Sequence, residues 1–99
     1  MSQGDIHRTR DGQAIVCRVQ TDLPVDSTYV LCAAVTPREG WGPLTPRLNI
    51  PFTLGGVPHV IVMTQMASLH TSMIGDRIGT ADHLRDEIVA AVDLLVAGF

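Results

Sequence analysis

The strongest structural signal in the sequence is the stretch at residues 80–99, TADHLRDEIVAAVDLLVAGF. Its apolar residues recur at steps of three and four, the spacing of one face of an α-helix. Asp82 is expected to cap this helix, and Asp86 and Glu87 lie where the helix dipole favours negative charge. The chain must therefore provide a surface for one amphipathic helix. The residues of its apolar face are Leu84, Ile88, Ala91, Val92, Leu95 and Phe99.

The second half of this helix allows two interpretations. Its other face carries Ala90, Asp93 and Ala97 at helical spacing, and no charged residue follows Asp93. An apolar end without a cap would normally fray unless something covers it. The tip either docks on the sheet of its own chain, which the pattern alone favours, or is offered to a partner.

Two turn signals predict β-hairpins before the helix. Asp11-Gly12 separates two extended runs and indicates a two-residue turn, in which both central positions have positive φ. The segment at residues 55–58, GGVP, separates a second pair of runs at 47–54 and 59–66. In the first hairpin, residues 13–20 alternate in the manner of a strand with one buried face.

The remaining segments complete a mainly β domain. Residues 28–35, TYVLCAAV, form a continuous apolar run that predicts a central strand covered on both faces. Residues 36–46 hold three prolines and form the longest irregular stretch, while residues 67–75 are expected to be a loop. The sequence therefore predicts about five strands and a terminal helix, in a single domain at 1–99.

Charge and cysteine usage restrict the class of function. The chain has 7 basic residues, all arginine, against 10 acidic ones. Because no basic stripe exists, general nucleic-acid binding is not expected, although a local basic site stays open. Cys17 and Cys32 lie in strand-like runs and are expected to be buried, reduced thiols of a cytoplasmic protein. No apolar run approaches the roughly 20 residues that span a bilayer, so no membrane is expected.

Residues that carry chemistry are scarce. The histidines lack metal-ligand spacing, and neither a phosphate-binding loop nor a nucleophile elbow is present. Trp41, between Gly40 and Gly42, is expected to cover an edge of the core, with a ligand platform as the alternative. The sequence predicts a binding protein that is not an enzyme and uses no metal or cofactor. The four histidines are His7, His59, His70 and His83.

Three stretches resemble the CcdB family, the toxins of plasmid and chromosomal toxin–antitoxin pairs. They are VQTDL at 19–23, MTQMASL at 63–69 followed by Ile74-Gly75, and the terminal helix closing on Gly98-Phe99. The resemblance covers residues 19–99, with a length difference around 36–47. It implies a small, bent, barrel-like antiparallel sheet of the CcdB/MazF/PemK kind, with an accessory sheet and a C-terminal helix.

The resemblance also implies a function. CcdB toxins are homodimers that bind the A subunit of DNA gyrase and trap its cleaved-DNA state, and a CcdA-like antitoxin neutralises them. Direct binding to nucleic acid is not implied. The gyrase-contacting positions lie at the end of the helix and in the loop after the second strand. They match Leu23, Pro24, Asp93, Val96, Ala97, Gly98 and Phe99.

The helix tip departs from the family pattern at one important position. The family ends in tryptophan, glycine and isoleucine, whereas this chain has Ala97 at the tryptophan position. An interface tryptophan contributes about 2–4 kcal/mol. Two alternatives to a gyrase poison follow: a CcdB-like homologue that binds another partner, or a MazF-type endoribonuclease. The second lacks support because Arg8-Thr9-Arg10 misses the proline of the arginine-proline segment in those enzymes.

Overall fold

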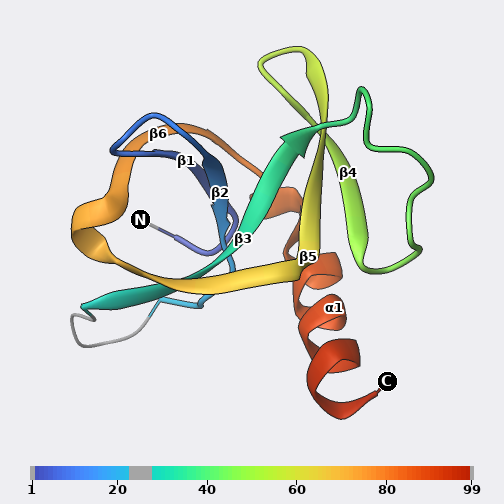
Figure 1. Ribbon diagram of the computed structural model, residues 1–99. Helices are drawn as coiled ribbons and strands as arrows, with labels where there is room; N and C mark the ends of the chain where they lie inside the picture. The colour runs from blue at the N-terminus through green and yellow to red at the C-terminus, as the bar shows by residue number, and fades with distance from the viewer. Residues whose placement is uncertain (1, 23–27, 99) are drawn as a thin grey trace.

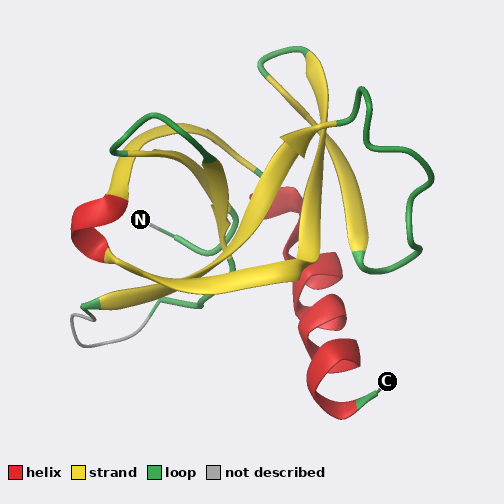
Figure 2. Ribbon diagram, viewed as in Figure 1, coloured by secondary structure: helices red, strands yellow, loops and turns green. Residues whose placement is uncertain are grey.

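The computed structural model describes residues 2–22 and 28–98, and it is mainly β, as the sequence predicts. The described chain forms six strands, two short 3-10 turns and an α-helix that follows the last strand (Figures 1 and 2). The elements are β1 (Asp5–Thr9), β2 (Ile15–Arg18), β3 (Tyr29–Pro37), β4 (Asn49–Leu54), β5 (Val57–His70), η1 (Thr71–Met73), β6 (Ile74–Thr80), η2 (Asp82–Leu84) and α1 (Arg85–Ala97).

All strand pairs are antiparallel, and the strand order is β4-β5-β3-β2-β1-β6. β5 has 14 residues and pairs with β4 and with both halves of β3. Its register on β3 jumps at one point, where Ala33 pairs with Met66 and Ala34 with Val62. β5 bends sharply, as Figure 1 shows. The described strands join one sheet, so none of them forms a separate accessory sheet.

The two edges of this sheet approach each other. A Cβ atom added to Gly79 in β6 would lie 2.5 Å from Cδ1 of Leu54, at the end of β4. Since real Cβ contacts are longer than this, a larger residue at this position would require the end of the Leu54 side chain to move. The edge strands β4 and β6 therefore meet through the Leu54 side chain, although no hydrogen-bonded pairing joins them.

Both predicted hairpins exist, but their turns differ from the expectation. Gly55 and Gly56 have φ of 58° and 81° and connect paired residues Leu54 and Val57, so this turn is shorter than predicted. The first hairpin was expected to have a two-residue turn, which is wrong: residues 10–13 form its loop. Asp11 Oδ1 accepts from the Thr9 hydroxyl at 2.6 Å, and this contact favours the wider loop.

Two segments expected to be irregular are strands. Residues 67–70 continue β5 and pair with the start of β3, and residues 74–80 form β6 beside β1. The chain thus has six described strands where about five were expected. Pairing with segments far away in the sequence supplies these hydrogen bonds, and local sequence carries little signal for it.

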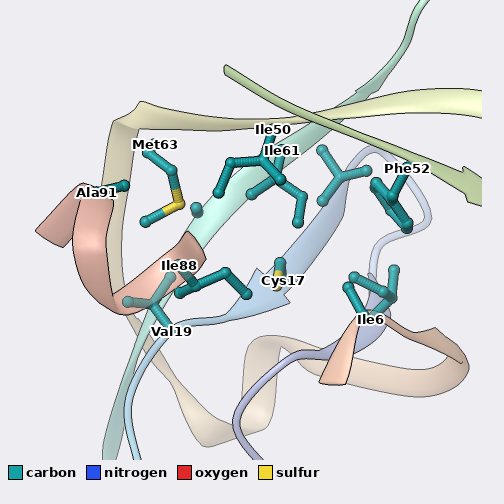
Figure 3. Packing of buried hydrophobic residues seen from close by; sticks show 12 residues of the cluster. Ile6, Cys17, Val19, Ile50, Phe52, Ile61, Met63, Ile88 and Ala91 are labelled. Atoms are coloured by element: carbon teal, nitrogen blue, oxygen red, sulfur yellow. The ribbon is translucent and has the colours of Figure 1, made fainter. Parts of the chain in front are cut away.

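The main core lies between one face of the sheet and α1 (Figure 3). The helix contributes Ile88 and Ala91, which are fully buried against residues from five of the strands. Burying an aliphatic side chain of this kind stabilises the fold by about 1.5–3 kcal/mol. The buried members of the cluster are Ile6, Cys17, Val19, Ala33, Val35, Ile50, Phe52, Ile61, Met63, Ala81, Ile88 and Ala91.

A smaller cluster covers the opposite face of the sheet. It contains Val16, Val30, Cys32 and Ile74, with Leu69 packed against it. The expectation that residues 13–20 bury one face is therefore wrong, because the start of β6 covers Val16. The prediction that β3 is covered on both faces is confirmed.

The two cysteines are free and buried, as predicted. Cys17 belongs to the main core and Cys32 to the smaller cluster. Burial raises the pKa of Cys17 to about 12 and that of Cys32 to about 11. Both therefore stay protonated at neutral pH and act as small apolar side chains.

Both ends of the predicted helix differ from the expectation. Asp82 is not the cap, because it opens η2, and α1 begins at Arg85. At the other end Gly98 adopts the left-handed conformation, and its N–H donates to the Leu94 carbonyl at 3.0 Å. This C-cap satisfies a terminal carbonyl, so the helix end is capped, whereas the sequence predicted an end without a cap.

Candidate functional site

The second half of α1 projects beyond the sheet (Figure 1). Ile88 is 0% exposed, whereas Leu95 is 40% and Val96 80% exposed. The expectation that the tip docks on the sheet of its own chain is thus wrong for the described residues. An apolar surface held away from the core is typical of a site that contacts another molecule.

The structure brings together four of the residues that the resemblance implies for gyrase binding. Asp93, Val96 and Ala97 lie at helical spacing and are exposed, and Gly98 follows them in the C-cap. Residues three and four apart share a helix face, so these side chains form one continuous surface. Leu23, Pro24 and Phe99 lie outside the described residues. We call residues 93–98 the helix tip.

The surface extends further along the helix than the sequence analysis indicated. Val89 is exposed, and Val92 is half-buried. With Val96 they lie at steps of three and four and form an apolar ridge leading to the tip. Sequence reasoning missed Val89 because the stripe through Ile88 already explained the apolar period. The sequence signal that could have identified this ridge is a second helical spacing of apolar residues, the valines at 89, 92 and 96.

Carboxylates lie on the same helix as this ridge, and Asp86 and Asp93 are beside it at helical spacing. Asp86, Glu87 and Asp93 on the helix are exposed, and so is Asp82 just before it, while Arg85 is the one basic residue of α1. Among the described residues, the only ion pair lies elsewhere, between Asp5 and Arg77. The acidic groups therefore remain available, and the surface suits a partner that combines apolar and basic side chains.

The base of the helix is fixed firmly to β1. The Ala81 N–H donates to the Gly4 carbonyl at 2.7 Å, and a Cβ on Gly4 would lie 2.9 Å from the Asp82 Cα. Gly4 has φ of 91°, which favours glycine. This close approach at one end and the packing of Ile88 hold the first half of the helix, and its far end extends away from the sheet.

An ionic contact reinforces this corner. The Asp5 carboxylate accepts from the Ser2 N–H at 2.8 Å and lies 3.2 Å from the Arg77 guanidinium. Burial raises the pKa of Asp5, but the Ser2 N–H and the positive charge of Arg77 outweigh it, so the net pKa is lowered. The carboxylate is therefore ionised at neutral pH and bridges the start of β1 to β6.

Three of the four histidines have structural hydrogen bonds. Nδ1 of His7 lies 3.0 Å from the Gly75 carbonyl, and Nδ1 of His59 lies 2.9 Å from the Val57 carbonyl. His70 caps η1, since its Nδ1 accepts from the Ser72 N–H at 3.1 Å. Within residues 2–22 and 28–98, no three side chains of the His, Cys, Asp or Glu type could hold a metal ion. Nor is any helix in these ranges long and apolar enough to cross a membrane.

Comparison with models of protein families identifies a family for this chain. The model of the family described as CcdB protein matches residues 4–98. No curated protein matches the chain. The family match covers the three stretches named above except for the last residue, and it adds residues 4–18, the part with β1 and β2.

Proposed function

Since this chain belongs to the CcdB family, the toxins of toxin–antitoxin pairs, we propose that it binds the A subunit of DNA gyrase through its helix tip and traps the cleaved-DNA complex. One observation supports the site: the tip is apolar and projects from the sheet, with Val96 80% exposed. The proposal treats the protein as a cytoplasmic binding partner that catalyses no reaction itself. Leu23, Pro24 and Phe99 are proposed to contribute on the grounds of the family resemblance alone.

The direct test is a gyrase pull-down and DNA cleavage assay with Val96→Asp. A charge in the centre of the tip should abolish binding while leaving the fold intact, because the side chain is exposed. Val57→Asp is a matched control, since Val57 is 52% exposed at the opposite end of the molecule from the tip, in the β4–β5 hairpin. Equal cleavage by both variants would contradict the proposal that the tip is the gyrase site.

We also propose that the protein is a homodimer, as the family is. Leu95 exposes apolar surface on the tip, and pairing of two tips would cover it together with the half-buried Leu94. Light scattering at micromolar concentration should give about twice the chain mass of 10.7 kDa. A mass of one chain would remove the model of paired tips.

A CcdA-like antitoxin is the proposed neutralising partner. The apolar ridge at Val89, Val92 and Val96, with Asp86 and Asp93 beside it, suits an extended segment that is partly apolar and partly basic. Such a segment would fold on docking, so calorimetry should show a large negative heat-capacity change. A neighbouring reading frame that encodes a small DNA-binding protein with a disordered tail is the candidate, and its failure to bind would count against this role.

Ala97 favours a second candidate function, a CcdB-like protein that binds another partner and does not poison gyrase. The side chain is exposed, so the tryptophan of the family pattern is absent from the contact surface and not from the core. Ala97→Trp should therefore strengthen gyrase binding without changing the melting temperature. No gain in binding, at an unchanged melting temperature, would favour the other partner.

The MazF-type endoribonuclease is the remaining alternative. It predicts cleavage of RNA by the purified protein, whereas the binding proposal predicts intact RNA under the same conditions. An RNA cleavage assay without gyrase separates the two. Cleavage that survives repurification would overturn the proposal that the protein acts by binding alone.

A further inference from the structure

The loop between β3 and β4 contains an unusual backbone position. Thr45, Pro46, Arg47 and Leu48 form a tight turn, in which the Leu48 N–H donates to the Thr45 carbonyl at 3.2 Å. Proline at the second position and φ of 70° at Arg47 in the third are the pattern of a type II turn. That third position calls for glycine or asparagine, because a Cβ is disfavoured at positive φ.

Elsewhere the chain meets this requirement with glycine. Arg47 is the one non-glycine residue with positive φ among residues 2–22 and 28–98, and seven glycines occupy the other such positions. Gly40 and Gly42 do so within the same loop. An arginine in the left-handed region costs conformational energy that glycine would not, and residues held in this way cluster at functional sites.

The Arg47 side chain has no role inside the molecule that would offset this cost. It is exposed, and it makes no hydrogen bond or ion pair with any other described residue. The acidic residue of the same loop, Glu39, is not in contact with it through an ion pair. The guanidinium is therefore presented to solvent with its donors free, on a loop that stands out from the sheet in Figure 1.

A buried asparagine holds Trp41 and the Arg47 turn in place together. Asn49 Oδ1 accepts from the Thr45 N–H at 2.8 Å and from the Trp41 indole N–H at 3.3 Å. Trp41 is half-buried, which agrees with the expectation that it covers an edge of the core. One side chain thus connects an aromatic ring to the turn that carries the free guanidinium.

We propose that Arg47 and Trp41 form a contact site for a single strand of nucleic acid, with the guanidinium on a phosphate and the indole against a base. Arginine binds phosphate with two parallel hydrogen bonds, and an aromatic ring in the same loop as a cation offers a face on which an unpaired base can stack. The site is local and weak, since the whole chain has a net charge of −3. It does not depend on gyrase binding.

The test is an NMR titration of the whole protein with an oligothymidylate of about 12 nucleotides at low salt. The amides of residues 38–48 and the indole N–H of Trp41 should shift. Arg47→Gly should weaken binding roughly threefold or more, and the slope of log affinity against log salt should fall by about 0.7. Its melting temperature should be unchanged or raised, because the positive φ then carries no strain.

Three controls make the result specific. Arg47→Asn tolerates positive φ but lacks the charge, so it should bind as poorly as Arg47→Gly. Arg85→Ala removes an exposed arginine from the start of α1 and should bind like the parent, which excludes a net-charge effect. An oligouridylate of the same length separates DNA from RNA as the source of the strand.

Several outcomes would overturn the proposal. These are no shift in the loop at millimolar oligonucleotide, equal binding by the parent and Arg47→Gly, and equal loss in Arg85→Ala. A Glu-rich peptide that shifts the loop more strongly than either oligonucleotide would also overturn it, and would assign the site to an acidic protein segment.

Discussion

The two halves of α1 share one sequence pattern and have opposite environments. In the first half Ile88 and Ala91 are fully buried under the sheet, while in the second half Leu95 and Val96 are exposed. Both halves continue the same apolar period, so periodicity cannot distinguish a docked turn from a projecting one. The difference arises where the sheet ends and the helix continues.

The two ends of the helix also use glycine differently. Gly4 supports the docked end, where the backbone of Asp82 approaches so closely that no Cβ fits. Gly98 caps the free end, where nothing lies within 4 Å of an added Cβ. Both glycines have positive φ, which disfavours a residue with a side chain. At Gly4 a side chain would also clash with its neighbours, whereas at Gly98 it would not.

The largest expected effect comes from truncating a buried side chain in the docked half of the helix. Ile88→Ala leaves a cavity in the main core and should lower the free energy of unfolding by about 2–5 kcal/mol. The matched change Leu95→Ala, in the projecting half, should lower it by less than about 1 kcal/mol. Urea denaturation of both variants measures this contrast, and similar losses would mean that the second half is also packed in solution.

Gly4→Ala tests the anchor at the docked end. The new Cβ would clash with Asp82 and force a residue with a side chain to keep φ of 91°, so a loss of about 2–4 kcal/mol is expected. Thermal melting by circular dichroism should show it. If stability stays at the level of the parent, the close approach of β1 to the start of the helix does not persist in solution.

Gly98→Ala tests the cap at the free end. Without a steric clash, the change should cost only about 1 kcal/mol, through the left-handed conformation. Hydrogen exchange should be faster at the amide of residue 98 and in the last turn, while amides near Ile88 keep their protection. Loss of protection along the whole helix would show that the two halves unfold together.

Protonation of Asp5 in acid should lower the free energy of unfolding by about 1 kcal/mol or less, because it removes a contact at the docked end. Its folded pKa is lowered, so the stabilisation is complete above the unfolded value near 3.9 and is lost as pH falls through the lower folded value. Urea midpoints from pH 7 to pH 2 should show that Asp5→Asn is less stable at neutral pH and that the difference closes in acid. A constant difference across this range would contradict the role of the carboxylate.

Local patterns recovered several elements correctly. The β4–β5 hairpin, the buried run in β3 and the helix at the C-terminal side were predicted because glycine φ preferences and apolar periods act within a few residues. The strand at residues 67–70 and β6 were missed, since their partners are β3 and β1, which lie far away in the sequence. Arg47 was missed as well, because no local rule predicts a positive φ at arginine.

In the candidate site, too, some features were predicted from the sequence and others only from the tertiary structure. Asp93, Val96, Ala97 and Gly98 were named through resemblance to a family, and helical spacing by itself placed Asp93 and Ala97 on one face. By itself the sequence determined the amphipathic period, the turn glycines and the family, because these depend on residue type and short spacing. Only the tertiary structure decided that the tip projects from the sheet, because exposure depends on where the bent sheet ends relative to the helix.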